Sequence, residues 1–464
     1  MIRTIHLKIV SVILSIAVLI FSYPLSFLEW NIDEDLTMND AFTNLKATQI
    51  DDKSVYAVNE TFDMFNYFGL TYSSDGYCKG HIVFSTLRNK IAEEDFFLEP
   101  GENKEFFSFV DGVRDAVKHK GIKTISVKNL TGENFELKSV KTFNRKIDDR
   151  IVYFSNDYYK IGIDLQWGGA LSYLEDLTHN VEAVVKDGHT KVDSNASQRY
   201  GEQVVNANVN LINCMDPGRL VQQSYYGPRE AEGYISGTYN GENWTYNPVQ
   251  GGNMFCDSSK IVDYRMSDDT LYVKCRPMDW SMTKEWITPS YMEAWYELSD
   301  NNVYVKCRFT DFSGYPECSQ ATELPAFYTI EPLQNFYYYS GNNPWQDEEL
   351  SVDKDLFFWA EDYQRHSFFN LTEKWVAFAG DFDDSFGIGV YSPSQKDLFA
   401  LAGIYMRNTT YTDNPAVEGG CSYVAIQYAD QLVFKTYSAF EYDYYISTGT
   451  VNEIRNNFKE INDK

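Results

Sequence analysis

The sequence predicts an all-β protein that ends in one short helix. Short apolar runs alternate with polar residues, turn-forming residues separate these runs, and aromatic residues make up 16% of the chain. Alternation with a period of two is typical of strands with one buried face, and Tyr, Phe and Trp favour strands. A length of 464 residues with 44% hydrophobic content suits globular folding around two cores.

Residues 45–145 are predicted to form a small β-sandwich or jelly-roll domain. Glycine-containing turn signatures such as Pro100-Gly101 and Thr131-Gly132 separate its strand-like runs, a spacing typical of sandwiches. The polar stretch 144–150 is the predicted linker. The strand-like runs are residues 80–85, 104–110, 124–128 and 135–140.

Residues 151–464 are predicted to form a large antiparallel β-sandwich. Residues 292–298 and 303–309 alternate on either side of a turn and predict a hairpin. Cys275 and Cys307 share the inward phase of their strands, which fits either a disulfide bond or two packed thiols. Further strands are predicted at residues 271–276, 375–379, 387–391, 399–405 and 439–446.

The C-terminal tail carries a helical pattern instead. Its apolar residues recur every three or four positions, and Thr450 with Glu453 fits a capping box. We therefore expect a short amphipathic helix that packs on the sheet. The apolar positions are Val451, Ile454, Phe458 and Ile461.

The N-terminus predicts export into the secretory pathway. Basic residues precede an apolar run from Ile9 to Leu28, so residues 1–30 are either a cleaved signal peptide or a retained signal anchor. The body of the chain is then expected to be secreted, or to lie on the non-cytosolic side of a membrane. Six acceptor sequons agree with a secreted glycoprotein, at Asn59, Asn129, Asn195, Asn243, Asn370 and Asn408.

The net charge and the spacing of the histidines limit which partners and metal sites we expect. The net charge of −27 repels nucleic acid and acidic membrane surfaces, so we expect no nucleic-acid partner, and membrane contact only through an N-terminal anchor. No His-x-x-x-His spacing is present, so neither a metal site nor a cofactor is predicted. The seven cysteines are too sparse for a disulfide scaffold.

The densest polar and aromatic segment, residues 208–227, is the predicted substrate-binding region. Guanidinium and amide groups bind hydroxyls, and aromatic rings stack on sugars. The alternative is structural: Asp216 caps a turn, Arg219 pairs with it, and the tyrosines belong to the core. The predicted binding residues are Trp167, Arg219, Gln222, Gln223, Tyr225 and Tyr226.

Acid and base catalysis on a sugar requires two carboxylates that face one pocket. The predicted pair is Asp216 with either Glu293 or Glu323, and Glu230 is a further candidate. A lyase would instead use Arg219 or Arg229 to neutralise a uronate and a tyrosine as base, although the negative charge of the whole chain counts against this variant. A Ser-His-Asp nucleophile has no support in the sequence, because Gly-x-Ser-x-Gly is absent.

The chain also resembles a largely uncharacterised family of secreted proteins. The residues that carry this resemblance are Trp167-Gly-Gly-Ala-Leu171, Asp216-Pro-Gly-Arg219, Gln222 to Tyr226 and Asn247-Pro-Val-Gln-Gly-Gly252. The resemblance implies a galactose-mutarotase-like β-supersandwich, as in sugar epimerases, polysaccharide lyases and glycoside hydrolase accessory domains. It places no catalytic histidine.

Two hypotheses follow for the function. In the first, the protein binds an oligo- or polysaccharide and acts as a glycoside hydrolase or a polysaccharide lyase. In the second, it is a non-catalytic surface or matrix glycoprotein that binds glycan or protein. Turnover of polysaccharides by the purified protein separates the two.

Overall fold

The computed structural model describes most of the chain from Leu36 to Lys464. The N-terminal segment, Asp216, Glu230 and the sequons at Asn59, Asn195 and Asn408 lie outside the described residues. The described residues are 36–43, 45–58, 64–108, 119–145, 150–179, 210–213, 217–229, 237–239, 241–267, 270–283, 287–299, 301–330, 333–354, 356, 367–380, 385–394, 398–405, 421–428 and 432–464.

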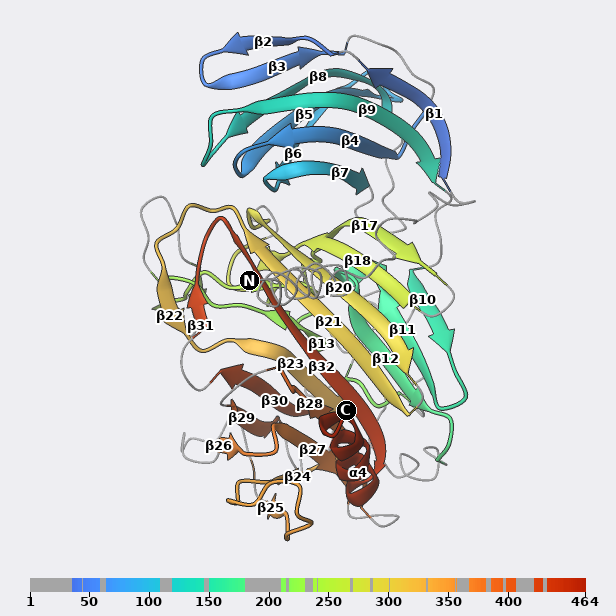
Figure 1. Ribbon diagram of the computed structural model, residues 1–464, viewed down its shortest axis with the longest axis vertical. Coiled ribbons are helices and arrows are strands. Elements are labelled where there is room, and N and C mark those ends of the chain that lie inside the picture. The colour runs from blue at the N-terminus through green and yellow to red at the C-terminus, as the bar shows by residue number, and fades with distance from the viewer. Residues whose placement is uncertain are drawn as a thin grey trace, which may run out of the picture.

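The N-terminal part is a small β-sandwich of two antiparallel sheets (Figure 1). One sheet has the order β1-β9-β4-β7, and the other has the order β2-β3-β8-β5-β6. Apolar side chains of both sheets meet between them, where Phe68 stacks on Phe107. The strands are β1 (Leu36–Thr43), β2 (Ala47–Ile50), β3 (Lys53–Ala57), β4 (Tyr67–Ser74), β5 (Cys78–Thr86), β6 (Ile91–Leu98), β7 (Gly101–Ser108), β8 (His119–Asn129) and β9 (Phe135–Arg145).

A ten-stranded sheet forms one layer of the large domain. Its main path has the order β10-β11-β12-β13-β23-β30-β29-β26; off this path, β16 pairs with β13, and β19 pairs with β16. The strands are β10 (Ile151–Ser155), β11 (Tyr159–Asp164), β12 (Ala170–Asp176), β13 (Val221–Ser224), β16 (Pro248–Val249), β19 (Met278–Asp279), β23 (Glu323–Ile330), β26 (Ser367–Leu371), β29 (Leu398–Tyr405) and β30 (Cys421–Tyr428); η2 (Leu165–Trp167) precedes β12.

A nine-stranded sheet forms the other layer, in the order β17-β18-β20-β21-β32-β28-β27-β24-β25. The predicted hairpin is its β20–β21 pair, with Ser299 opposite Asn302. The strands are β17 (Lys260–Met266), β18 (Thr270–Arg276), β20 (Ser290–Ser299), β21 (Asn302–Asp311), β24 (Asn335–Tyr338), β25 (Ser351–Asp353), β27 (Trp375–Ala379), β28 (Phe386–Tyr391) and β32 (Ser438–Thr450); the short pairs are β14 (Thr238–Tyr239) with β15 (Glu242–Asn243) and β22 (Cys318–Gln320) with β31 (Leu432–Phe434).

The main hydrophobic core lies between these two layers. It joins Val221 and Phe327 of the ten-stranded sheet to Val273, Val305 and other buried side chains of the nine-stranded sheet. Cys275 and Cys307 are both part of this core, and both are free thiols. Packed thiols are therefore what the structure contains, and no disulfide joins this pair. The predicted all-β supersandwich with a preceding small sandwich is confirmed.

The predicted C-terminal helix is also confirmed. Helix α4 (Val451–Asn462) begins after Thr450, whose hydroxyl accepts a hydrogen bond from the Glu453 amide in a capping box. Ile454 and Phe458 are buried against β27 and β28 of the nine-stranded sheet (Figure 1). Among the described residues, no helix has both the length and the apolar character needed to cross a membrane.

The small sandwich covers the outer face of β17, β18, β20 and β21 (Figure 1). Tyr291 and Phe312 of the large domain belong to the same hydrophobic cluster as the core of the small sandwich. Lys274 lies between the core residues Val273 and Cys275 and so points outward from β18, yet only 3% of its surface is exposed, because the small domain packs over it. This face is an interdomain interface.

Candidate functional site

The predicted binding segment continues through β13, and its side chains alternate between two environments. Gln223 and Tyr225 point into the sandwich. Gln223 Nε2 donates to the backbone oxygen of Glu293 at 2.9 Å, and Tyr225 stacks on Phe309 with ring centroids 4.0 Å apart. Both side chains are buried, so they hold the two sheets together and cannot reach a ligand in this arrangement.

The side chains of Gln222 and Trp167 also make contacts within the fold. Gln222 accepts a hydrogen bond from the Gly251 amide at 2.7 Å and donates one to the Gly218 oxygen at 2.8 Å. Trp167 is buried under the guanidinium of Arg150, 4.5 Å from its ring centroid. Arg219 is half-buried on the turn before β13. Its predicted partner Asp216 lies outside the described residues.

Glu293, one of the predicted catalytic carboxylates, lies at the interdomain interface. Arg308 Nη1 is 2.8 Å from its Oε2, and the Tyr272 hydroxyl donates to Oε1 at 2.7 Å. Arg308 also pairs with Glu99 of the small domain at 2.5 Å. Burial raises the pKa of Glu293, but the positive charges of Lys274 and Arg308 outweigh it and hold the pKa below its usual value.

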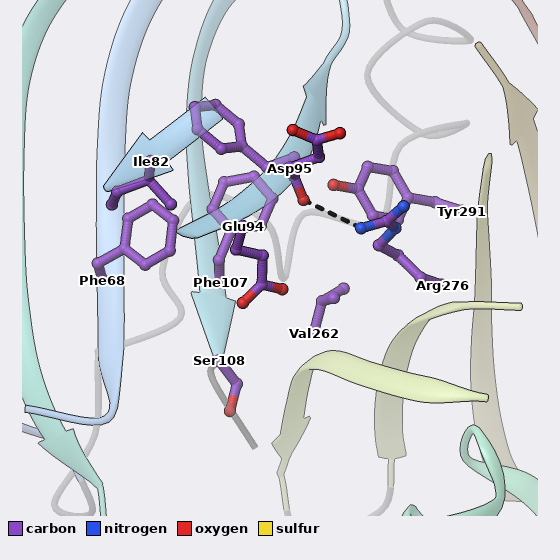
Figure 2. A pocket seen from close by; sticks show the side chains of 10 residues that line it. Phe68, Ile82, Glu94, Asp95, Phe107, Ser108, Val262, Arg276 and Tyr291 are labelled. Atoms are coloured by element: carbon purple, nitrogen blue, oxygen red, sulfur yellow. Dashed lines mark hydrogen bonds between the residues drawn. The ribbon is translucent and has the colours of Figure 1, made fainter. Parts of the chain in front are cut away.

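The interface also contains a small pocket (Figure 2). Phe68 and Phe107 of the small domain and Val262 and Tyr291 of the large domain line it, and Arg276 donates a hydrogen bond to the Asp95 oxygen at its rim. Its cavity volume is about 10 Å³, which is about the space that one water molecule requires. The pocket is too small for a sugar ring.

Glu323 occupies a different environment, on the ten-stranded sheet. It begins β23 opposite Ser224 of β13, and it remains half-buried. The hydroxyl of Tyr423, from the neighbouring strand β30, donates a hydrogen bond to its Oε1. Ser224 and Tyr226 also hydrogen-bond to its carboxyl group. Three hydroxyl groups from two strands and the segment after β13 therefore surround one carboxylate.

This group lies on the outer face of the ten-stranded sheet. Tyr423 packs with Ala326 and Ala425 in a cluster separate from the main core, whereas Phe327 and Val424 point into that core. Tyr328 packs on Tyr423 with ring centroids 4.4 Å apart. Strands β13, β23 and β30 are hydrogen-bonded neighbours, and Figure 1 shows them near the middle of the large domain.

Tyr226 connects the carboxylate to an aromatic platform, which we define as Tyr226, Tyr239, Trp244 and Trp280. Tyr226 meets Trp244 edge to face at 6.2 Å between ring centroids. Tyr239 and Trp280 continue the contact, with centroids 4.7 Å apart. All four side chains are half-buried, so part of each ring faces solvent. Such rings can stack on the apolar faces of sugars.

Asn247 joins the carboxylate group to the platform. Its Nδ2 donates to Ser224 Oγ at 3.2 Å, which leaves the Ser224 hydrogen directed to Glu323. Its Oδ1 accepts from Trp244 Nε1 at 3.2 Å, and its backbone oxygen accepts from the Trp280 amide at 2.8 Å. Because Asn247 is buried, one side chain fixes both parts of the site.

The pKa of Glu323 is shifted in the opposite direction to that of Glu293. Burial raises the pKa of Glu323, and hydrogen bonds from Tyr423, Ser224 and Tyr226 oppose the shift only in part. The carboxyl group therefore takes up a proton more readily than an ordinary glutamate. A partly accessible carboxyl with a raised pKa suits proton exchange with a ligand.

Sequence reasoning included Glu323 and Tyr226 but missed the residues that complete the site. Trp244, Trp280 and Tyr423 come from three other segments, so no local motif contains them, and Ser224 lay within the predicted segment without being named as a site residue. One signal was available: alternation along β13 puts Ser224 and Tyr226 on one face and Gln223 and Tyr225 on the other. The structure does not bring Glu293 together with Glu323.

Three predicted glycan acceptors lie within the described residues. Asn129 is engaged by the fold, because its Nδ2 donates to Asp75 Oδ1 at 2.8 Å and to the Asn134 oxygen at 2.9 Å. The side chains of Asn243 on β15 and Asn370 on β26 are exposed. Asn243 directly precedes Trp244 of the platform.

Comparison with known proteins gives a likeness in solved structures only. No family model matches the sequence, and no curated protein is similar to it. A galactose mutarotase related enzyme from Lactobacillus acidophilus is 11% identical with a TM-score of 0.37, over 66% of this chain and 99% of that one. A 4-α-glucanotransferase from Thermococcus litoralis is 10% identical with a TM-score of 0.31, over 65% of this chain and 38% of that one.

A GH36 α-galactosidase from Geobacillus stearothermophilus is 9% identical with a TM-score of 0.34, over 65% of this chain and 40% of that one. These neighbours carry names of mutarotase-like and carbohydrate-processing proteins. At such TM-scores the likeness tells nothing about the chemistry of this chain. The fold class follows from the two antiparallel layers themselves.

Proposed function

We propose that this protein binds a carbohydrate on the outer face of its ten-stranded sheet, and that Glu323 exchanges a proton with the bound sugar. One observation carries the proposal: a half-buried carboxyl with a raised pKa, surrounded by hydroxyl groups, is continuous through Tyr226 with a platform of partly exposed aromatic rings. Sugar sites need both a ring-stacking surface and groups that exchange hydrogen bonds with hydroxyls.

The chemistry available to Glu323 depends on its protonation. Its protonated form donates a hydrogen bond to a sugar oxygen, and its ionised form accepts one, so it serves as general acid or general base. Glycoside hydrolysis needs a second carboxylate in the same pocket. Glu293 is held by Arg308 on the other sheet, so the partner that we propose for hydrolysis is Asp216.

We also propose that the protein is an exported glycoprotein. The N-terminal apolar segment and the exposed acceptors Asn243 and Asn370 support this. Expression in a eukaryotic cell should yield a secreted or membrane-anchored protein that migrates above 53.6 kDa and shifts down on deglycosylation. Cytosolic protein of unchanged mobility would contradict export.

The test of the site is binding and turnover by the purified protein. A panel of neutral and acidic polysaccharides is measured by calorimetry, and products are separated by chromatography, for wild type, Glu323→Gln and a control, Glu317→Gln. Glu317 is an exposed residue of the large domain. We expect Glu323→Gln to weaken binding about tenfold and to abolish any turnover, with the control unchanged.

Each outcome has a clear reading. Equal binding by wild type and Glu323→Gln would exclude this site. Binding by wild type without any product would favour the non-catalytic glycan-binding function over an enzyme. Turnover of acidic polysaccharides alone would favour a lyase, in which the exposed Arg229 is available to neutralise a uronate.

A further inference from the structure

A second apolar surface borders the aromatic platform. Met254 and Phe255 form the tip of a turn and are 38% and 49% exposed. The Met254 amide donates a hydrogen bond to the Trp280 oxygen at 3.0 Å, so the turn is attached to the outer member of the platform. This backbone contact places the exposed Met254 and Phe255 next to Trp280, at the end of the platform away from Tyr226.

The turn that presents Phe255 is held in place by Asn253. The Oδ1 of Asn253 accepts hydrogen bonds from the amides of Phe255 at 3.0 Å and Asp257 at 2.9 Å, and its Nδ2 donates to the Met282 oxygen at 2.8 Å. An exposed aromatic ring on a fixed turn loses little conformational entropy when a ligand stacks on it. The turn with Phe255 is therefore preorganised for binding.

We infer that the ligand is a chain of sugar units, with one unit at Glu323 and later units along Trp280 and Phe255. This inference rests on the proposed function of the Glu323 site. A single sugar ring covers only one end of the surface, whereas successive rings of a chain present successive apolar faces to it. The net charge of −27 disfavours a polyanionic chain, so the ligand class is a neutral oligosaccharide.

Length dependence of binding tests the inference. Dissociation constants are measured by calorimetry for glucose, galactose and mannose and for cello-, malto- and manno-hexasaccharides. The proteins are wild type, Glu323→Gln, Phe255→Ala, Phe255→Trp and Tyr158→Ala. Tyr158 is 41% exposed in the turn between β10 and β11 and serves as the matched control. The melting temperature of each variant confirms that it is folded.

We expect wild type to bind one hexasaccharide at least tenfold more tightly than the corresponding monosaccharide. Phe255→Ala should weaken hexasaccharide binding about tenfold, which equals about 1.4 kcal/mol, and should leave monosaccharide binding unchanged. Phe255→Trp should retain hexasaccharide binding, and so should Tyr158→Ala.

Two failures are distinguishable. If Glu323→Gln weakens sugar binding but Phe255→Ala does not affect the hexasaccharide, the extended surface is overturned and the Glu323 site stands. If the wild type binds no member of the panel, the Glu323 site and the extended surface are both overturned.

Discussion

Glu293 and Glu323 are the same residue type on the two sheets of one sandwich, yet their surroundings differ in kind. Glu293 is covered by the small domain and paired with Arg308, and its pKa is lowered. Glu323 is partly open and surrounded by hydroxyl groups, and its pKa is raised. Glu293 is thus part of the contact between the domains, whereas the donors to Glu323 in the described part of the chain are uncharged hydroxyl groups, which leaves its carboxyl group available for chemistry.

The largest effect is expected from removal of Arg308, the cation that Glu293 and Glu99 share. Arg308→Ala leaves Glu293 and Glu99 without their shared cation at a largely buried interface, so the free energy of unfolding should fall by about 3 kcal/mol. Urea denaturation measures this. Lys138→Ala, which breaks an exposed pair with Glu102, is the control and should cost less than about 1 kcal/mol. Equal losses would refute a special role for the interface network.

The same contrast between engaged and available groups applies to the sequons. Asn129→Ala removes hydrogen bonds to Asp75 and the Asn134 oxygen and should lower the free energy of unfolding by about 2 kcal/mol. Asn243→Ala should change stability by less than about 0.5 kcal/mol. In glycoprotein from eukaryotic cells, peptide mass spectrometry should find glycan at Asn243 and none at Asn129. Full occupancy of Asn129 would contradict the structural assignment.

A smaller effect is expected at the Glu323 site itself. Tyr423→Phe removes one hydroxyl donor and keeps the ring packed on Tyr328, so the free energy of unfolding should fall by about 1 kcal/mol. Loss of that donor should raise the pKa of Glu323 further, because the bond favours the ionised form. Sugar binding should then show its pH dependence at higher pH than in wild type. An unchanged pH profile would argue that Tyr423 does not act on Glu323.

The smallest expected effect is in the pH dependence of stability. A raised carboxyl pKa contributes stability that is present below the unfolded value of 4.5 and is lost as pH rises through the folded pKa. Wild type should therefore lose stability relative to Glu323→Gln as pH rises above 4.5. Glu293 has the opposite sign, because its lowered pKa contributes stability above 4.5 that is lost as pH falls through the folded value. Each slope stays under about 1.4 kcal/mol per pH unit.

The titration of Asp311 does not affect the comparison of stability between wild type and the two variants. Burial raises its pKa to about 6, so it adds its own slope, but that slope is the same in wild type and both variants and cancels in the difference. If the stability difference from wild type changes with pH in the same direction for Glu293→Gln and Glu323→Gln, the two carboxyl groups do not have opposite pKa shifts.

The sequence predicted much of the fold because strand alternation and turn residues are local signals. The β20–β21 hairpin and the capping box of α4 are examples. Alternation along β18 and β20 shows which side chains share a face of the sheet. It does not show whether a second domain packs on that face, so it could not reveal that the small domain covers it. This is why Glu293 looked like an available carboxylate, although it is an interface residue.

The candidate site was only partly predictable for a related reason. Glu323 and Tyr226 were identified, but Tyr423 reaches Glu323 from a distant segment because β30 pairs with β23, and Trp280 joins the platform through Trp244 and Tyr239. Asn247 was noted only as part of a resemblance, and its role as the link between Ser224 and Trp244 depends on side-chain geometry. Sequence spacing carries no information on such contacts.

If Glu293 holds the domains together and Glu323 exchanges protons with a ligand, the pKa values of the two carboxyl groups must shift in opposite directions. Protein labelled with ¹³C at the glutamate carboxyl is titrated by NMR, and the two signals are assigned by their loss in Glu323→Gln and Glu293→Gln. We expect Glu323 to titrate above 4.5 and Glu293 to titrate below 4.5. Titration of Glu323 at or below 4.5, or of Glu293 above 4.5, would show that the two carboxyl groups do not have these different roles.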